Sequence, residues 1–172
     1  MNVIRTLSLF SVSILLAPLL RAQQMHPPAR STPAFDQLKS LAGNWQGHDT
    51  SGNVVQLNYK VVSNGSVVME QLVPSSKEAE MITMYSLEGD RIVVTHYCSA
   101  GNQPTMQTAP LAAATGTYDF SFVRVAGTQT PDEGHMVALT VSLLDKDHLR
   151  QVWTFEDHGK SMKETFTYTR MK

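Results

Sequence analysis

The sequence predicts an all-β protein: an antiparallel up-and-down meander of about nine or ten strands with a short helix before it. From Asn44 onward, apolar residues recur with a period of two in short runs, as in strands with one buried face. Turn-forming sequences separate these runs at short intervals. A meander of this many strands closes into a barrel or a sandwich, because an open sheet leaves unpaired edges.

The first 22 residues have the layout of a secretory signal peptide rather than part of the fold. Met1 to Arg5 is a short basic region, an apolar run follows to Leu20, and Ala22 is a small residue at the expected cleavage point. The apolar run is too short for a membrane span, and Pro18 interrupts it. We therefore expect export to the periplasm or the medium, with no integral membrane anchor after cleavage. Residues 23–31 are expected to form a flexible leader, and residues 32–172 one barrel domain.

A short helix is expected directly after the leader. Thr32 can cap its N-terminus, with Pro33 at the first helical position. One face then carries apolar side chains, and Gly43 ends the helix. The residues expected on that face are Phe35, Leu38, Leu41 and Ala42. A helix this short is not stable alone, so we expect it to plug one end of a larger structure.

The remaining chain divides into strands and turns. Asn64-Gly65 is a strong hairpin signal, and Glu88-Gly89-Asp90 marks a second hairpin. Two further turns are expected at 145–147 and 157–159. The expected strands are one beginning at Trp45, then 54–62, 66–73, 80–87, 91–98, a short strand within 105–110, 117–126, 136–144, 149–156 and 162–171.

Charge and cysteine content exclude several classes of partner and stabilisation. The chain has a formal net charge of -1 and no basic run, which argues against nucleic acid as a partner. It holds a single cysteine, Cys98, so an internal disulfide is impossible and stability must come from packing. The sequence does not predict an oligomeric state.

Two motifs carry a resemblance to known families. Gly43-Asn44-Trp45-Gln46-Gly47, after a short helix, resembles the start of the calycin barrels: lipocalins, fatty-acid-binding proteins and nitrobindin-like barrels. His96-Tyr97-Cys98 followed by Gly101-Asn102-Gln103-Pro104 is similar to a stretch in secreted bacterial lipocalin-like domains of uncharacterised function. This resemblance implies a lipocalin- or nitrobindin-like barrel.

The resemblance also implies roles for individual residues. In lipocalins, a basic residue late in the last strand packs over the tryptophan of the first strand, which here implies that Arg170 covers Trp45. Nitrobindin-like barrels hold haem iron through a histidine near the C-terminus, and the last expected strand has no histidine. This absence counts against haem, and no cofactor is predicted; a haem- or metal-binding barrel is one of the alternatives that remain open.

The period of two places several polar residues on faces that are otherwise apolar. If the apolar members face inward, His96, Cys98, Gln151, Glu164 and Arg170 lie inside the barrel. Buried polar groups must be paired or must face a ligand. We therefore expect a cavity that binds a small, mostly apolar ligand. The residues expected to form this site are Trp45, His96, Cys98, Asn102, Gln151, Glu164 and Arg170.

Other interpretations of the same residues remain open. His96 could be a general acid or base assisted by Glu164 or Cys98, which would make the barrel an enzyme. It could equally be a structural histidine, with Glu164 and Arg170 forming a salt bridge at a barrel mouth. A metal site needs three or four ligands, and no spacing in the sequence supports one.

Overall fold

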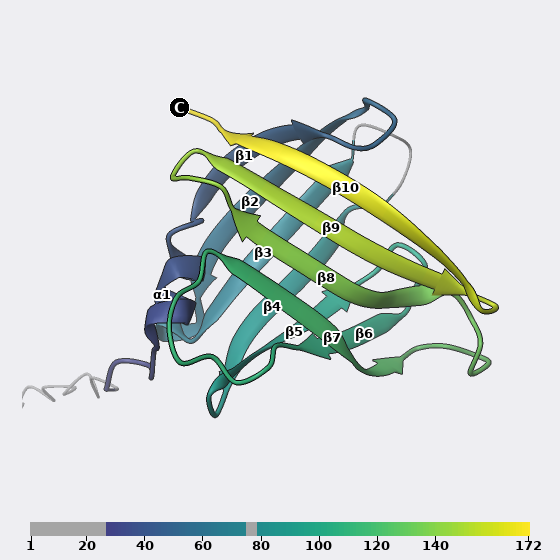
Figure 1. Ribbon diagram of the computed structural model, residues 1–172, viewed down its shortest axis with the longest axis horizontal. Coiled ribbons are helices and arrows are strands. Elements are labelled where there is room, and N and C mark those ends of the chain that lie inside the picture. Colours follow the sequence, from purple (N-terminus) through teal and green to yellow (C-terminus); the bar gives the residue numbers. More distant parts are fainter. Residues whose placement is uncertain (1–26, 75–78) are drawn as a thin grey trace, which may run out of the picture.

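The computed structural model describes residues 27–74 and 79–172. It is a closed barrel of antiparallel strands with one short helix at one end (Figure 1). The predicted signal peptide, 1–22, lies outside the described residues, as do the first residues of the predicted leader.

Every strand pairs with its neighbours in sequence, and the first strand pairs with the last to complete the ring. The elements are α1 (Pro33–Lys39), β1 (Gly43–His48), β2 (Val54–Val62), the 3-10 turn η1 (Ser63–Gly65), β3 (Val67–Pro74), β4 (Met81–Glu88), β5 (Arg91–Tyr97), β6 (Gln103–Gln107), β7 (Thr117–Ala126), β8 (His135–Leu143), β9 (His148–Asp157) and β10 (Lys160–Arg170). The predicted meander is therefore confirmed, and it closes as a barrel rather than as a sandwich.

The largest difference from the sequence-based prediction concerns β6. It begins at Gln103, inside the segment predicted as a loop, and ends at Gln107. Gln103 and Pro104 pair with β7, whereas pairing with β5 starts only at Thr105. Pro104 therefore lies near the beginning of the strand, where a residue without an N–H is tolerated.

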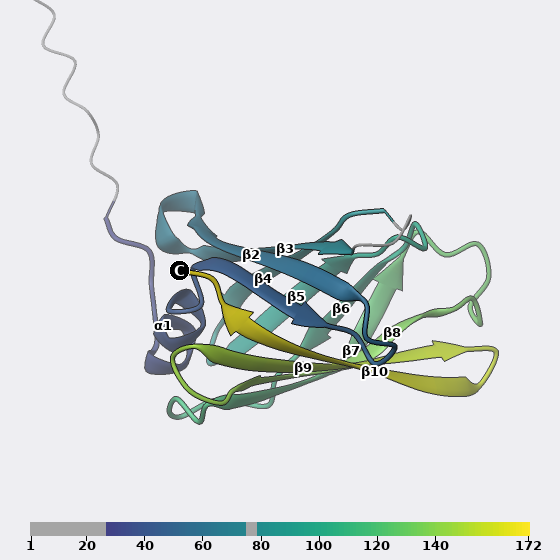
Figure 2. The ribbon, with the colours of Figure 1, turned by 90° about the horizontal axis from the view of Figure 1, so that it is seen from above.

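The helix α1 covers one end of the barrel, which we call the closed end (Figure 2). Thr32 caps it as predicted, its Oγ1 accepting a hydrogen bond from the Phe35 N–H at 3.2 Å. Ala34, Phe35 and Leu38 are buried. Ala42 is exposed, contrary to the prediction, because the helix ends at Lys39 and the chain has already turned toward β1.

Side chains from all around the ring fill the barrel near the closed end. The largest fully buried side chains are Trp45, Tyr59, Tyr85, Tyr118, Tyr168, Phe35 and Phe120. Tyr118 also donates a hydrogen bond to the Ala34 carbonyl at 3.2 Å, which ties the helix to β7. In the part of the chain that the structure describes, no helix has the length and apolar character needed to cross a membrane.

Candidate functional site

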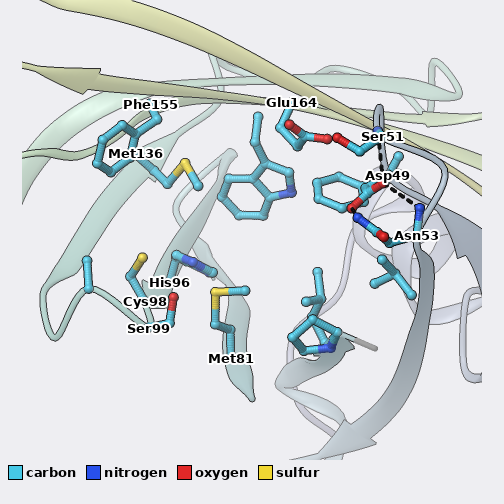
Figure 3. Close-up of a pocket in the computed structure, with 16 residues that line it drawn as sticks. Asp49, Ser51, Asn53, Met81, His96, Cys98, Ser99, Met136, Phe155 and Glu164 are labelled. Carbon is cyan, nitrogen blue, oxygen red and sulfur yellow. Dashed lines mark hydrogen bonds between the residues drawn. The ribbon is translucent and has the colours of Figure 1, made fainter. Parts of the chain in front are cut away.

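The end of the barrel opposite α1, which we call the open end, contains a cavity of about 620 Å³ (Figure 3). Its walls come from the loop between β1 and β2 and from the ends of most of the long strands. The larger apolar side chains that line it are Leu72, Met81, Met136, Trp153, Phe155 and Phe166. An apolar cavity of this size with a few polar groups is typical of small-molecule sites.

One side of the cavity is acidic. The Asp49 carboxylate accepts hydrogen bonds from the N–H groups of Ser51 at 2.9 Å and Asn53 at 2.8 Å. The side-chain amide of Asn53 also donates to Asp49, and these bonds lower the pKa of the Asp49 carboxyl. Glu164 Oε1 accepts from the Thr50 N–H at 2.8 Å and from the Thr50 hydroxyl. The loop between β1 and β2 is thus tied to β10.

The opposite side carries His96, Cys98 and Ser99 at the end of β5 (Figure 3). His96 is only 3% exposed, and its Nδ1 lies 2.9 Å from the Thr83 hydroxyl. Its ring packs on that of Trp153 with 4.7 Å between centroids. Burial lowers the pKa of His96 to about 4, so the imidazole is neutral at pH 7.

The second nitrogen of His96, Nε2, is buried and has no hydrogen-bond partner among the described residues. A buried polar atom without a partner costs free energy, typically about 1–3 kcal/mol. In a residue that lines a cavity, such an atom indicates a position where a bound molecule would complete the hydrogen bonding.

A polar network lies deeper in the barrel than the cavity. Glu70 is fully buried, and its Oε2 accepts hydrogen bonds from the Tyr59 hydroxyl at 2.6 Å, the Tyr85 hydroxyl at 2.7 Å and the Gln151 amide at 2.8 Å. Trp153 Nε1 donates to Gln151 Oε1 at 3.2 Å, so the network reaches a residue of the cavity wall. The other oxygen, Oε1, has no partner among the described residues, and burial raises the pKa of the Glu70 carboxyl.

Glu70 is not among the site residues predicted from the sequence. It lies between Val68 and Leu72 in β3, and both neighbours at a spacing of two are buried. The same alternation that placed His96 inside the barrel therefore places Glu70 there as well. The alternation in β3 is the sequence feature from which Glu70 can be found.

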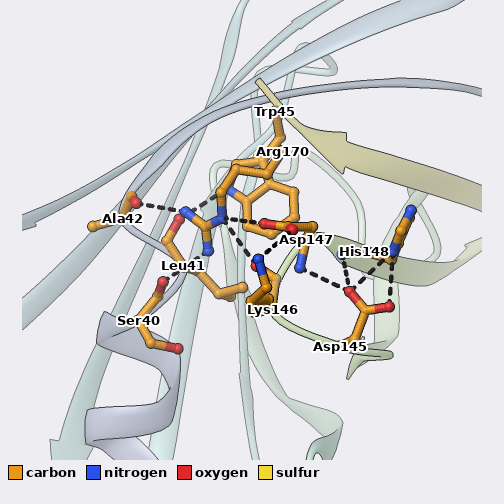
Figure 4. A network of polar contacts seen from close by, with 9 residues as sticks. All are labelled: Ser40, Leu41, Ala42, Trp45, Asp145, Lys146, Asp147, His148 and Arg170. Carbon is orange, nitrogen blue, oxygen red and sulfur yellow. Dashed lines mark hydrogen bonds and ion pairs between the residues drawn. The ribbon is translucent and has the colours of Figure 1, made fainter. Parts of the chain in front are cut away.

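Trp45 and Arg170 meet at the closed end (Figure 4), and neither lines the cavity. The Arg170 guanidinium carbon lies 4.1 Å from the centroid of the Trp45 ring, which confirms the predicted contact. Arg170 also donates to the carbonyls of Ala42 at 2.9 Å, Ser40 at 2.9 Å and Lys146 at 3.0 Å. It does not pair with Glu164, because these two residues of β10 lie toward opposite ends of the barrel.

The predicted site residues therefore fall into separate groups. Asn102 is buried in the loop between β5 and β6, where its amide donates to the Gly134 carbonyl at 2.8 Å and holds two loops together. The structure places the others in the cavity wall (His96, Cys98 and Glu164), in the deeper network (Gln151) and at the closed end (Trp45 and Arg170).

The described residues do not form the catalytic pairs that were considered from the sequence. No hydrogen bond joins His96 to Glu164 or Cys98 in the described structure; the ring contacts Thr83 instead. Within residues 27–74 and 79–172, no group of three or more His, Cys, Asp and Glu side chains is arranged to hold a metal ion. What the arrangement can do is enclose an apolar molecule and hydrogen-bond it.

Comparison with known proteins supports the fold alone. No protein-family profile matches the chain, and no curated protein matches it. Among solved structures, it is similar to a protein of unknown function of the DUF3598 family from Nostoc punctiforme, with a TM-score of 0.52 and 14% sequence identity. The match covers 78% of this chain and 49% of that one, so the chain spans about half the length of this neighbour.

Proposed function

We propose that the barrel binds a small, mostly apolar molecule that carries a polar group, and that the cavity at the open end is the binding site. The observation that carries this proposal is that Nε2 of His96 is buried without a partner among the described residues, in a cavity lined mainly by apolar side chains. A ligand with a hydroxyl, carbonyl or amide group at this point would satisfy the histidine.

The surrounding residues suit this role. Trp153, Phe155 and Phe166 offer large apolar surfaces, and Met81 and Met136 provide flexible side chains that adapt to a ligand. The contact between Thr83 and Nδ1 fixes the orientation of the His96 ring, which reduces the entropy lost on binding.

A titration with the neutral fluorescent hydrophobe N-phenyl-1-naphthylamine tests the proposal. We expect saturable binding to one site per chain. Met136 lines the cavity, so Met136→Trp should fill it and weaken binding at least tenfold. Met162 is 58% exposed, so Met162→Trp is the matched control and should bind as the wild type does. Equal affinities for the two variants, or no saturable binding by the wild type, would contradict the proposal.

Cys98 allows an independent test of the same site. It is the chain's single cysteine and lines the cavity, so a bulky maleimide can be attached there alone. We expect the labelled protein to lose binding of the hydrophobe while its circular dichroism spectrum is unchanged. Unchanged binding by fully labelled protein would place the site elsewhere.

We also propose that the chain acts outside the cytoplasm. The support is the signal-peptide layout of residues 1–22. Mass spectrometry of the protein from cells should give a mature chain that begins at Gln23. An intact chain that begins at Met1 in the cytoplasmic fraction would contradict this.

A further inference from the structure

We propose that the cavity selects a cationic amphiphile, an apolar molecule whose protonated amine lies beside Asp49 and Glu164. This inference rests on the proposed binding function and names the chemical class of its ligand. It is carried by the charges of the cavity lining together with Nε2 of His96 on the opposite side, which has no partner among the described residues. The amine is a second polar group of the ligand, in addition to the group that contacts His96.

The described lining holds negative charge without compensation. It includes the carboxylates of Asp49 and Glu164 and no lysine or arginine. The hydrogen bonds to both carboxylates come from backbone N–H groups and neutral side chains, and neither carboxylate has an ion-pair partner among the described residues. His96 is neutral at pH 7, since burial lowers its pKa to about 4. The lining is therefore net negative at that pH.

The acidic side of the cavity can also accept a further hydrogen bond. Glu164 Oε1 accepts both bonds from Thr50, while Oε2 accepts none from the described residues. Phe166 lies two positions along β10 from Glu164, and it also lines the cavity. Aromatic faces attract cations, so the ring and the carboxylate favour the same kind of head group.

The deeper polar network around Glu70 also offers no positive charge to an acidic ligand. The layer beyond Trp153 contains a third carboxyl, that of Glu70, whose hydrogen bonds come from two tyrosines and a glutamine. A carboxylate ligand would therefore meet no positive charge among the described groups at either depth. A neutral ligand would bind through apolar contacts, and an amine would gain the electrostatic attraction in addition.

Three probes that share one alkyl chain and differ in the head group test this inference: decylamine, decan-1-ol and decanoate. Each is used to displace N-phenyl-1-naphthylamine from the protein at pH 7 and low ionic strength. We expect decylamine to bind at least tenfold more tightly than decanol, and decanol more tightly than decanoate. Raising the salt concentration should reduce the preference for the amine, because exposed charges are screened.

The outcomes separate the inference from the proposed function. If decanol and the fluorescent probe bind but decylamine binds no better than decanoate, the inference is overturned and the binding function stands. If none of the probes binds, the binding function itself fails.

Variants locate the charge that is responsible. Glu164→Gln, alone and combined with Asp49→Asn, should reduce the preference for decylamine over decanol at least threefold. Glu156 is exposed on β9 and lies outside the cavity lining, so Glu156→Gln removes one negative charge as a matched control. A preference that survives in the double variant, or is lost equally in the control, would overturn the assignment.

Discussion

Replacing His96 by asparagine should remove a large part of the protein's loss of stability in mild acid. The pKa of His96 is lowered from its ordinary value of 6.5 to about 4 by burial. The unfolded chain therefore binds a proton at this residue between pH 6.5 and 4 where the folded chain does not. The contribution of His96 is complete above pH 6.5 and is lost as the pH falls toward 4.

The magnitude follows from the two pKa values. One pKa unit corresponds to about 1.4 kcal/mol, so the full effect is about 3 kcal/mol, of which about 2 kcal/mol is lost between pH 7 and pH 5. Asparagine does not titrate in this range, and it places a polar atom near the position of Nδ1, where it can still contact Thr83. The free energy of unfolding of His96→Asn should therefore change less with pH.

Urea unfolding followed by tryptophan fluorescence at pH 5, 6 and 7 measures this. The quantity of interest is the difference in unfolding free energy between wild type and His96→Asn at each pH, since any contribution shared by both proteins cancels. His48→Asn removes an exposed histidine from β1, and any pH dependence that it produces is subtracted. Wild-type and His96→Asn stabilities that stay parallel from pH 7 to pH 5 would refute the reasoning.

Three other predictions concern Glu70, Arg170 and Gly47. Burial raises the pKa of Glu70 above 4.5, so the free energy of unfolding of the wild type should fall as the pH rises through the folded-state pKa. Glu70→Gln lacks this titration, so urea unfolding at pH 4, 6 and 8 should show its stability rising relative to that of the wild type. A difference in unfolding free energy that is the same at all three pH values would contradict this. Arg170→Lys removes the guanidinium that donates to three carbonyls, and urea unfolding should show a loss of about 2 kcal/mol in the free energy of unfolding. Ligand affinity at the open end should not change. A loss of affinity would show that the two ends of the barrel are coupled. In Gly47→Ala the new Cβ would overlap the Thr167 carbonyl, and the free energy of unfolding should fall by at least about 2 kcal/mol. In Gly52→Ala the new Cβ would meet no described atom within 4 Å, and the φ of +84° alone should cost about 1 kcal/mol. Equal thermal shifts for the two variants would contradict the steric argument.

The fold could be predicted because its determinants are local. The alternation in each strand and the turn residues between strands are both visible within a few positions, and a meander joins each strand to the next one. Asn64-Gly65 illustrates this: the turn that it predicts lies between β2 and β3, and Asn64 adopts the expected positive φ of 55°. Closure into a barrel follows from the need to pair the edges of β1 and β10.

The site was harder to predict because alternation separates inside from outside but does not give the depth. Trp45 lies in the first half of β1 and His96 lies near the end of β5, and these two strands run in the same direction in the meander. The two residues therefore had to lie toward opposite ends, although both face inward. Strand direction was available from the sequence, whereas the stagger between strands, which determines what each side chain meets, was not.

The network around Glu70 shows what remained out of reach. Its partners come from β2, β4 and β9, and Gln151 of β9 is 81 positions away in sequence. Two of the three strands neighbour β3, so Tyr59 and Tyr85 are found from the pairing. The contact with Gln151 exists only because the barrel brings opposite walls together.

The two ends of the described chain both lie at the end of the barrel that carries α1 (Figures 1 and 2). The Pro27 carbonyl contacts Asn64 in the turn between β2 and β3, and the Met171 N–H donates to Asn44 at the start of β1. A linker, an affinity tag or a solid support joined at either end of the described chain is therefore attached at the closed end of the barrel. The open end then faces away from whatever the chain is attached to, so that attachment at either of these two ends leaves the cavity accessible.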